Sequence, residues 1–586
     1  MAAQATQAKL ATINALDANY RFQNDSTFSG THWSNRTHTM QFGGNKLETT
    51  KADEPAHAAD NFALIKKPRH NVHTMLSLLG DTQVSFSPGM NDQVSGLATR
   101  LRALFPGTSS FTSVKQRNKI DSQLMKAHKP FIGFRALCLL ATVGLLANSG
   151  KPGAAANAPE TSVKNLKLKV SANGRYFVDQ QGKPFFYLGD TCWLLFQRLN
   201  HEELDEYLKD RVAKGFTVMQ AYVIRGLGKQ HPDGNSSLLG ASPFIDRDPT
   251  RPNEEFFKNM DYTVDRANEL GLVMGLVTAK SWHVTDHSEK IFDEKNAYTF
   301  GKFLGERYKN NAVMWFPGGD SDPGKYDAIW VAMAKGLKDG CGGSQLICYH
   351  GQGSTSSSMW FHNADWLDFN SIQSGHNFGS DSYAFVSKDY ALTPAKPTVD
   401  MEPAYENHPT GADKPRVDSH KVRTQAYLAM LAGAAGHGYG SLDLFYFYKD
   451  TDGPFPKNGF QHWRTAMAYE GSRQVGYMRR LFEERPWYKM VPDQSVLASN
   501  PGGGPFRLAA ARAEDRSFAV AYTPVGQPLK IALKAIRASH IKAQWYDPRT
   551  GTWKAIGQYP NDGTQEFVPP SRAAKDDWVL VLDAIR

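Results

Sequence analysis

Cysteine is scarce in this sequence, and its spacing is not that of a metal site. The 586 residues include four cysteines, Cys138, Cys192, Cys341 and Cys348. None belongs to a Cys-x-x-Cys pair or to a cluster with histidine, the spacings that zinc sites use. We therefore expect neither a metal centre nor a cofactor. Cys341 and Cys348 are near enough in sequence to form a disulfide bridge in an oxidising compartment, although the sequence leaves their pairing open.

The sequence also lacks the features of a nucleic-acid-binding protein. Its formal charge is +9, but it contains no sustained basic helix, zinc-finger spacing or RNP-like motif. Many lysines and arginines are interspersed with acidic residues, a pattern typical of solvated faces. We expect no nucleic-acid partner. A content of 41% hydrophobic and 12% aromatic residues indicates instead a globular protein with large cores.

The uncharged apolar stretch 136–147 has 12 residues, whereas a membrane-spanning helix needs about 20. It follows the basic segment 125–129 and precedes the small residues 154–158. This order is typical of a secretory signal peptide, although a short buried helix is the alternative. We expect a signal peptide and cleavage region over 125–158, and a protein exported to the periplasm or the outside without a membrane span after cleavage. Residues 1–124, which are polar and aperiodic, are expected to be disordered or an extension from a start codon placed too far upstream.

Beyond Lys183, short apolar strands alternate with amphipathic helices, which predicts parallel β/α units. We expect helices over 203–214, 253–270, 296–309, 326–338, 382–390, 419–435 and 463–483. We expect eight strands over 184–190, 216–223, 272–279, 312–320, 346–351, 367–375, 396–402 and 438–444. Eight such units predict an α/β fold, a (β/α)8 TIM barrel over 165–485.

The pattern changes after the joint at Arg485 and Pro486. Short alternating runs separated by Gly, Pro and Asp turns predict a small C-terminal β-sandwich over 486–586. The expected strands are 506–511, 517–523, 531–535, 541–546 and 578–582. We expect this domain to pack beside the barrel and stabilise it, with contact to a glycan as the alternative role.

Two carboxylates, Asp320 and Glu402, each end a short apolar run that is predicted to be a buried strand. Cleavage of a glycosidic bond needs one carboxyl group to protonate the leaving oxygen and another to meet the positive charge at the anomeric carbon. Either acid taken alone could be a strand-end cap that binds backbone amides. Together, on a barrel whose active site lies at the C-terminal strand ends, they predict a glycosidase.

Polar and aromatic residues follow the ends of the other predicted strands. Indole rings suit the apolar faces of a sugar, and side-chain hydrogen-bonding groups suit its hydroxyls. We expect the two tryptophans of this set to cover the sugar and Asp190, His283, His350 and Gln373 to hold its hydroxyls. The predicted substrate-binding set is Asp190, Trp193, Gln220, Trp282, His283, His350, Gln373, His376 and Tyr405.

Several motifs resemble those of the apiosidase-like glycoside hydrolases, family GH140, also described as DUF4038 proteins. The motifs are Asn-Gly-Arg-Tyr-Phe-Val-Asp at 173–179, Phe-Phe-Tyr-Leu-Gly-Asp-Thr at 185–191, Ala-Lys-Gly-Phe at 213–216, Gly-Gly-Asp at 318–320 and Asp-Met-Glu-Pro-Ala-Tyr-Glu at 400–406. The resemblance covers about residues 165–586. It implies that Asp320 matches the general acid/base, that Glu402 matches the nucleophile, and that the substrate is an apiose-containing pectic glycan such as rhamnogalacturonan II.

The resemblance also implies that the C-terminal domain is the module labelled as collagen-binding in this family, although nothing in its residues requires collagen. Two departures flank the acids: Ser321-Asp322 follows where the family pattern has Arg after the aspartate, and Met401 stands where it has Gly. Both departures bear on the specificity of the subsites.

Three functions fit the sequence. The leading one is a retaining glycoside hydrolase, exo- or endo-acting, on a plant-type oligo- or polysaccharide. The second is an inactive barrel that binds glycans, and the third is a surface interaction protein that works through the C-terminal sandwich. The presence of both Asp320 and Glu402 favours the enzyme. The sequence does not determine the oligomeric state.

Overall fold

The computed structural model describes residues 162–227, 241–376, 379–410, 415–450 and 460–585, together with four short strands nearer the N-terminus. The chain divides into two units, Met1–Ser149 and Gly150–Arg586. In the first unit, an antiparallel sheet is formed by β1 (His32–Ser34), β2 (Thr37–Phe42), β3 (Asn45–Thr50) and β4 (Gln83–Phe86). The aperiodic sequence did not predict this sheet. The predicted signal peptide lies outside the described residues.

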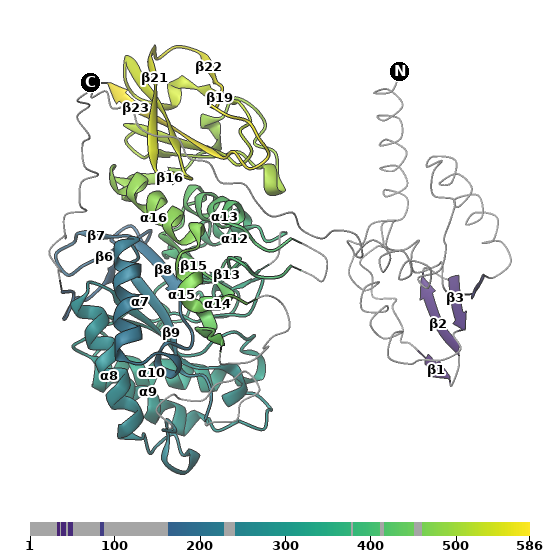
Figure 1. The fold of residues 1–586 in the computed structure, drawn as a ribbon, viewed down its shortest axis with the longest axis vertical. Helices are drawn as coiled ribbons and strands as arrows, with labels where there is room; N and C mark the ends of the chain where they lie inside the picture. Colours follow the sequence, from purple (N-terminus) through teal and green to yellow (C-terminus); the bar gives the residue numbers. More distant parts are fainter. Residues whose placement is uncertain are drawn as a thin grey trace, which may run out of the picture. The chain divides into compact units, whose positions relative to one another are not determined.

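The second unit contains the predicted (β/α)8 barrel (Figure 1). Its parallel strands are β8 (Tyr187–Thr191), β9 (Val218–Ile224), β10 (Val273–Ala279), β11 (Val313–Phe316), β13 (Asn370–Gln373), β14 (Thr398–Asp400) and β15 (Gly436–Gly440), and β12 (Thr355–Ser356) pairs antiparallel with β13. The parallel strands lie in the order β11-β10-β9-β8-β15-β14-β13.

The predicted fifth strand fills the gap between β11 and β13. It is reduced to one parallel bridge between Trp315 and Ile347. On its other side, the N–H of Asp368 donates to Ile347 O at 2.8 Å.

The last barrel strand differs from its prediction. It covers 436–440, and the apolar run that we expected to complete it forms the helix α14 (Leu442–Tyr446). Three glycines occupy alternate positions of β15, and a Cβ at Gly438 would collide with the backbone oxygen of Met401. The space between neighbouring strands therefore requires glycine here, and glycine removes the hydrophobic signal by which a buried strand is identified.

Helices surround the barrel strands (Figure 1). The helix α7 (His201–Ala213) begins with a capping box formed by Asn200 and Glu203, and α9 (Glu294–Tyr308) begins with one formed by Asp293 and Asn296. The predicted helix over 463–483 is broken into two at Ala468 and Tyr469. The helices are α6 (Leu195–Arg198), α7 (His201–Ala213), α8 (Glu254–Glu269), α9 (Glu294–Tyr308), α10 (Asp327–Cys341), α11 (Ser358–Phe361), α12 (Ser382–Tyr390), α13 (Ser419–Leu431), α15 (Trp463–Met467) and α16 (Glu470–Glu483).

A small antiparallel sheet precedes the barrel, formed by β5 (Lys169–Val170), β6 (Phe177–Val178) and β7 (Pro184–Phe185). The first predicted strand, 184–190, is thus shared between two sheets, because β7 and β8 are separate. Cys341 and Cys348 are both free and buried, so the disulfide bridge between them is absent. Among the described residues, no helix combines the length and apolarity that a bilayer span requires.

The C-terminal domain consists of antiparallel sheets, as predicted. The larger sheet has the order β16 (Met490–Pro492), β17 (Ala509–Ala513), β18 (Phe518–Thr523), β23 (Trp578–Ile585), β20 (His540–Asp547) and β21 (Thr552–Pro560), and the smaller one pairs β19 (Leu529–Ala532) with β22 (Thr564–Phe567). One face of the larger sheet, with Val520, Tyr522 and Val581, shares the barrel's hydrophobic core. The other face, with Ala519 and Leu580, forms a separate core with β19.

A buried ion pair joins the C-terminal domain to the barrel. The guanidinium of Arg423 on α13 donates to both carboxylate oxygens of Asp577, at 2.9 and 2.7 Å, and the Tyr522 hydroxyl donates to the same carboxylate at 3.0 Å. The side chains of Arg423 and Asp577 are 4% and 0% exposed. The ring of Tyr522 also stacks on Tyr427 of α13, with 4.9 Å between the centroids. The larger sheet is thus fixed to the barrel through both polar and apolar contacts.

Candidate active site

Asp320 lies just beyond β11, at the end of a tight backbone turn. A Cβ added at Gly318 would lie 2.5 Å from the ring of Trp330, and one added at Gly319 would lie 2.5 Å from the hydroxyl of Tyr222. Two glycines therefore let the chain pass between these side chains. Asp320 itself has a φ of +56°, and its N–H donates to His350 O at 3.1 Å. The strand end and this hydrogen bond hold the backbone of Asp320 in a left-handed conformation that non-glycine residues seldom adopt.

Glu402 follows β14 and has a more enclosed carboxylate, which is 6% exposed. His376 Nε2 lies 3.1 Å from Oε1, within hydrogen-bond distance. His350 Nε2 lies 2.8 Å from Oε2, an ion-pair distance without hydrogen-bond alignment. Burial acts to raise the pKa of Glu402, but the close contacts and charges of the two imidazoles outweigh it and hold this pKa well below its usual range. The carboxylate is therefore ionised at neutral pH.

Aromatic rings surround Glu402. The Trp193 indole N–H donates to the Tyr405 hydroxyl at 3.0 Å, and the charge of Glu402 acts on the same hydroxyl. The Trp193 ring lies 4.8 Å from Tyr222 and 5.4 Å from His350 between centroids. His376 packs on Tyr405 at 4.1 Å. Aromatic ring faces and hydrogen-bonding groups thus both lie beside the carboxylate, a combination that suits a sugar ring.

Asp320 has a cationic neighbour. Lys280, the first residue after β10, donates from Nζ to Asp320 Oδ2. The Lys280 side chain is 7% exposed and that of Asp320 is 39% exposed. The carboxylates of Asp320 and Glu402 both act electrostatically on Tyr222 and on Lys280. Asp320 and Glu402 therefore lie near the same two residues, Tyr222 and Lys280, at one end of the barrel.

The structure brings together four of the nine predicted substrate-binding residues around Glu402. These are Trp193, His350, His376 and Tyr405. Trp282 lies beside Lys280 instead, with Lys280 Nζ 5.4 Å from the centroid of its ring. Gln373 is buried at the end of β13, and its role remains a prediction.

The prediction for Asp190 is wrong. Its carboxylate accepts a hydrogen bond from Tyr207 at 2.5 Å and one from Arg211 at 3.1 Å, and Asp190 and Arg211 are fully buried. The strand alternation explains this, because Tyr187 and Thr191 on β8 bond to Gln220 inside the barrel while Asp190 faces the helix α7. Asp190 is a structural ion-pair residue.

Gln220 and His283 were also predicted wrongly as sugar ligands. The Gln220 amide accepts from Tyr187 and donates to Thr191 and to Met401 O, at 2.7 to 3.1 Å, so it cross-links the barrel interior. His283 is fully buried, and its ring nitrogens lie 3.2 and 3.3 Å from the backbone oxygens of Glu289 and Arg225. It braces the loop after β10.

The predicted set did not include three residues of the site: Tyr222, Arg225 and Lys280. The guanidinium of Arg225 lies 5.2 Å from the ring centroids of Tyr222 and Trp282. Arg225 and Lys280 share a signal that could have revealed them, because each is the first charged residue after an uncharged strand that is mostly apolar. Among the described residues, no group of three His, Cys, Asp or Glu side chains is placed to hold a metal ion.

Comparisons with known proteins agree with this geometry. Residues 171–489 match a family model described as "Apiosidase-like, catalytic domain", and residues 491–583 match one described as "Putative collagen-binding domain of a collagenase". A solved structure titled "Glycoside hydrolase" is 31% identical, with a TM-score of 0.66 over 72% of this chain and 97% of that one. A family 5 glycoside hydrolase from Bacteroides vulgatus is also 31% identical, with a TM-score of 0.65 over 71% and 92% of the two chains. None of the curated proteins compared with the chain matches it.

Proposed function

The chain belongs to the apiosidase-like glycoside hydrolases, and we propose that it cleaves its substrate with retention of anomeric configuration. In this proposal Glu402 is the nucleophile and Asp320 the general acid/base. The observation that carries it is the contrast between the two acids. Glu402 is enclosed and held ionised by His350 and His376, whereas Asp320 is 39% exposed and reaches the solvent side.

The reaction would proceed in two displacements. The Glu402 carboxylate attacks the anomeric carbon and forms a glycosyl ester, while the glycosidic C–O bond breaks and the leaving oxygen takes the proton of Asp320. Water then gives a proton to the Asp320 carboxylate and attacks the same carbon, which breaks the ester and restores Glu402. The enclosed position of Glu402 suits direct attack, and the more exposed position of Asp320 suits exchange of protons with the leaving group and water.

Product stereochemistry tests the retaining mechanism. We expect the first-formed product, observed by ¹H NMR within the first minutes of reaction, to have the anomeric configuration of the substrate. An active enzyme whose first-formed product has the opposite configuration would exclude a glycosyl ester at Glu402. The uncatalysed mutarotation of the same free sugar, recorded alone, is the control for the time window.

For the substrate, we propose an apiose-containing pectic glycan. The support is the family match and the motifs around both acids, together with the aromatic wall formed by Trp193, Tyr222 and Tyr405. A screen of apiosides, arabinosides and rhamnogalacturonan fragments tests this choice, with release of reducing sugar as the measurement. Release from arabinosides in the absence of release from apiosides would overturn the choice of sugar and leave the glycosidase activity standing.

We also propose that the protein is exported. The support is the order of basic, apolar and small residues over 125–158. We expect the mature chain from the native host to begin near Ala156 to Ala158, as measured by N-terminal sequencing of the secreted or periplasmic fraction. An exported mature chain that retains residues 1–124 would contradict this processing.

A further inference from the structure

We propose that Lys280 is a positioning residue for Asp320: its ammonium group fixes one oxygen of the acid/base carboxylate and leaves the other to exchange protons. This inference rests on the proposed function. Of the two carboxylate oxygens, Oδ2 is the one that Lys280 contacts. The backbone of Asp320 is fixed by the hydrogen bond from its N–H to His350 O. With the backbone held, the ammonium contact at Oδ2 restricts the direction in which Oδ1 points.

Lys280 itself is held in place, unlike most lysines. Its backbone N–H donates to Ile224 O at 3.1 Å, and the residue forms a parallel bridge with Gly319. Its side chain is 7% exposed and passes beside the ring of Trp282. A lysine normally keeps its charged end in water, so the burial of this one requires a compensating partner, which Asp320 supplies.

Other charged groups act on Lys280. Burial lowers its pKa, and Arg225 acts in the same direction, while Asp320 and Glu402 oppose them. Lys280 donates directly to Asp320, and the Arg225 guanidinium packs over the rings of Tyr222 and Trp282.

The consequence for catalysis follows from the two roles of Asp320. In the first displacement the Asp320 carboxyl group gives a proton to the leaving oxygen, and in the second the carboxylate accepts a proton from water. Both steps need the same carboxylate oxygen to face the reacting group. Lys280 therefore sets the orientation of the acid/base.

The test is Lys280→Met, which keeps the length of the side chain and removes its charge. We expect kcat/KM on glycosides with ordinary leaving groups to fall by about 100-fold, since misplacement of a reacting group by 1 Å can cost that much. The loss should be smaller on aryl glycosides with activated leaving groups. Lys280→Arg, which keeps the positive charge, should recover most of the loss on ordinary leaving groups.

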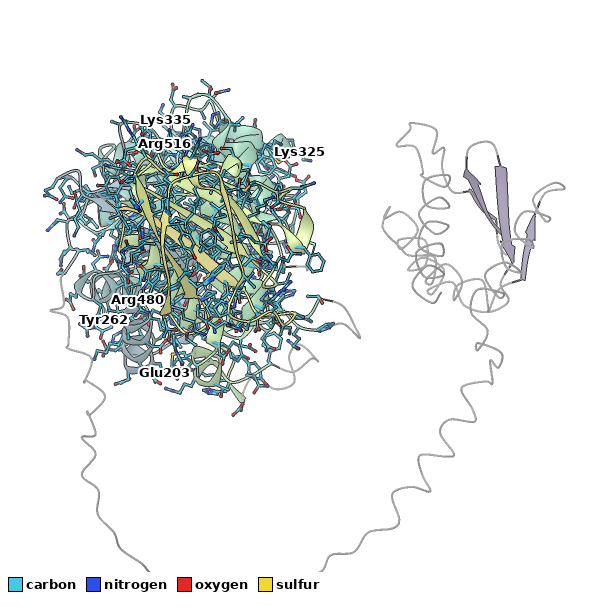
Figure 2. All side chains as sticks on the ribbon, turned by 90° about the horizontal axis from the view of Figure 1, so that it is seen from above. Glu203, Tyr262, Lys325, Lys335, Arg480 and Arg516 are labelled. Atoms are coloured by element: carbon cyan, nitrogen blue, oxygen red, sulfur yellow. The ribbon has the colours of Figure 1, made fainter. Side chains whose placement is uncertain are left out.

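A double-mutant cycle with Asp320→Ala separates positioning from other roles. If Lys280 acts through Asp320, the double variant should be no slower than Asp320→Ala, within about twofold. Lys325→Met is the matched control, because Lys325 and Asp286 form an exposed ion pair at 2.6 Å between the loops that follow the same two strands, and Lys325 lies at the surface (Figure 2). It should leave kcat/KM on both classes of glycoside within about twofold of wild type.

Three results would overturn the inference. The first is a Lys280→Met variant with raised KM and unchanged kcat, and the second is a loss that adds to that of Asp320→Ala. The third is a Lys280→Arg variant that is folded by circular dichroism and does not recover activity on ordinary leaving groups. If Lys280→Met does not fold, the double variant with Asp320→Ala still decides the question, because it removes both charges of the pair together. An inactive wild-type enzyme refutes the proposed function instead, so the two failures are distinguishable.

Discussion

Replacing Glu402 by alanine should reduce turnover of every glycoside to background, whereas replacing Asp320 should spare substrates with an activated leaving group. Loss of the nucleophile removes the bond-forming step, an effect on the order of 10⁴-fold or more. Loss of the acid costs about 10² to 10⁴-fold on an ordinary leaving group. A leaving group that departs without a proton does not need Asp320 in the first displacement.

The measurement is kcat/KM for both variants on a series of aryl glycosides of graded leaving-group acidity, beside a natural glycoside. Asp286→Ala is a matched control, because Asp286 is an exposed carboxylate in the loop after β10 and pairs with Lys325 at the surface. Its activity should stay within about twofold of wild type, as is usual away from the reacting groups. Equal losses for Asp320→Ala across the series would remove Asp320 from the acid role.

Much of the barrel could be predicted from the sequence, because most of its strands are apolar runs and its helices are amphipathic with clear caps. The last strand could not be placed correctly. Close contact with neighbouring backbone requires glycine at alternate positions of β15, so the strand lacks apolar side chains at those positions, while the apolar run beyond it is helical. Hydrophobicity alone indicates burial, and it does not distinguish a short buried helix from a strand.

The site was predicted in part for a related reason. Position at a strand end predicted Glu402 and four of its neighbours, because the barrel gathers these ends. The same rule failed for Asp190, whose side chain faces Arg211 on the helix side. Successive side chains of a strand point to opposite faces of the sheet, so an error of one residue in the predicted register places a side chain on the wrong face. Lys280 was missed because a lysine after a strand is usually solvated, and only the fold reveals that this one is buried against Asp320.

Removing the buried cation at the domain junction should destabilise the whole second unit. Arg423→Ala leaves the Asp577 carboxylate, which is fully buried, without its bidentate partner. Loss of one partner of a buried pair costs about 3 to 5 kcal/mol in the free energy of unfolding. Urea denaturation followed by tryptophan fluorescence measures this loss. Lys575→Ala is the control, because Lys575 and Asp418 pair at the surface and such a pair contributes about 0 to 1 kcal/mol.

The number of unfolding transitions shows whether the barrel and the β-sandwich unfold together. The sheet face with Val520 and Tyr522 shares the barrel's core, so we expect barrel and sandwich to unfold in one transition in the wild-type protein. Two separate transitions, with a loss below about 1 kcal/mol in Arg423→Ala, would contradict a structural role for the junction. A single transition would mean that the β-sandwich stabilises the barrel. The sheet face that packs on α13 and α16 would then be unavailable to a partner. A ligand of the C-terminal domain, such as the collagen that its family description names, would have to bind to another surface.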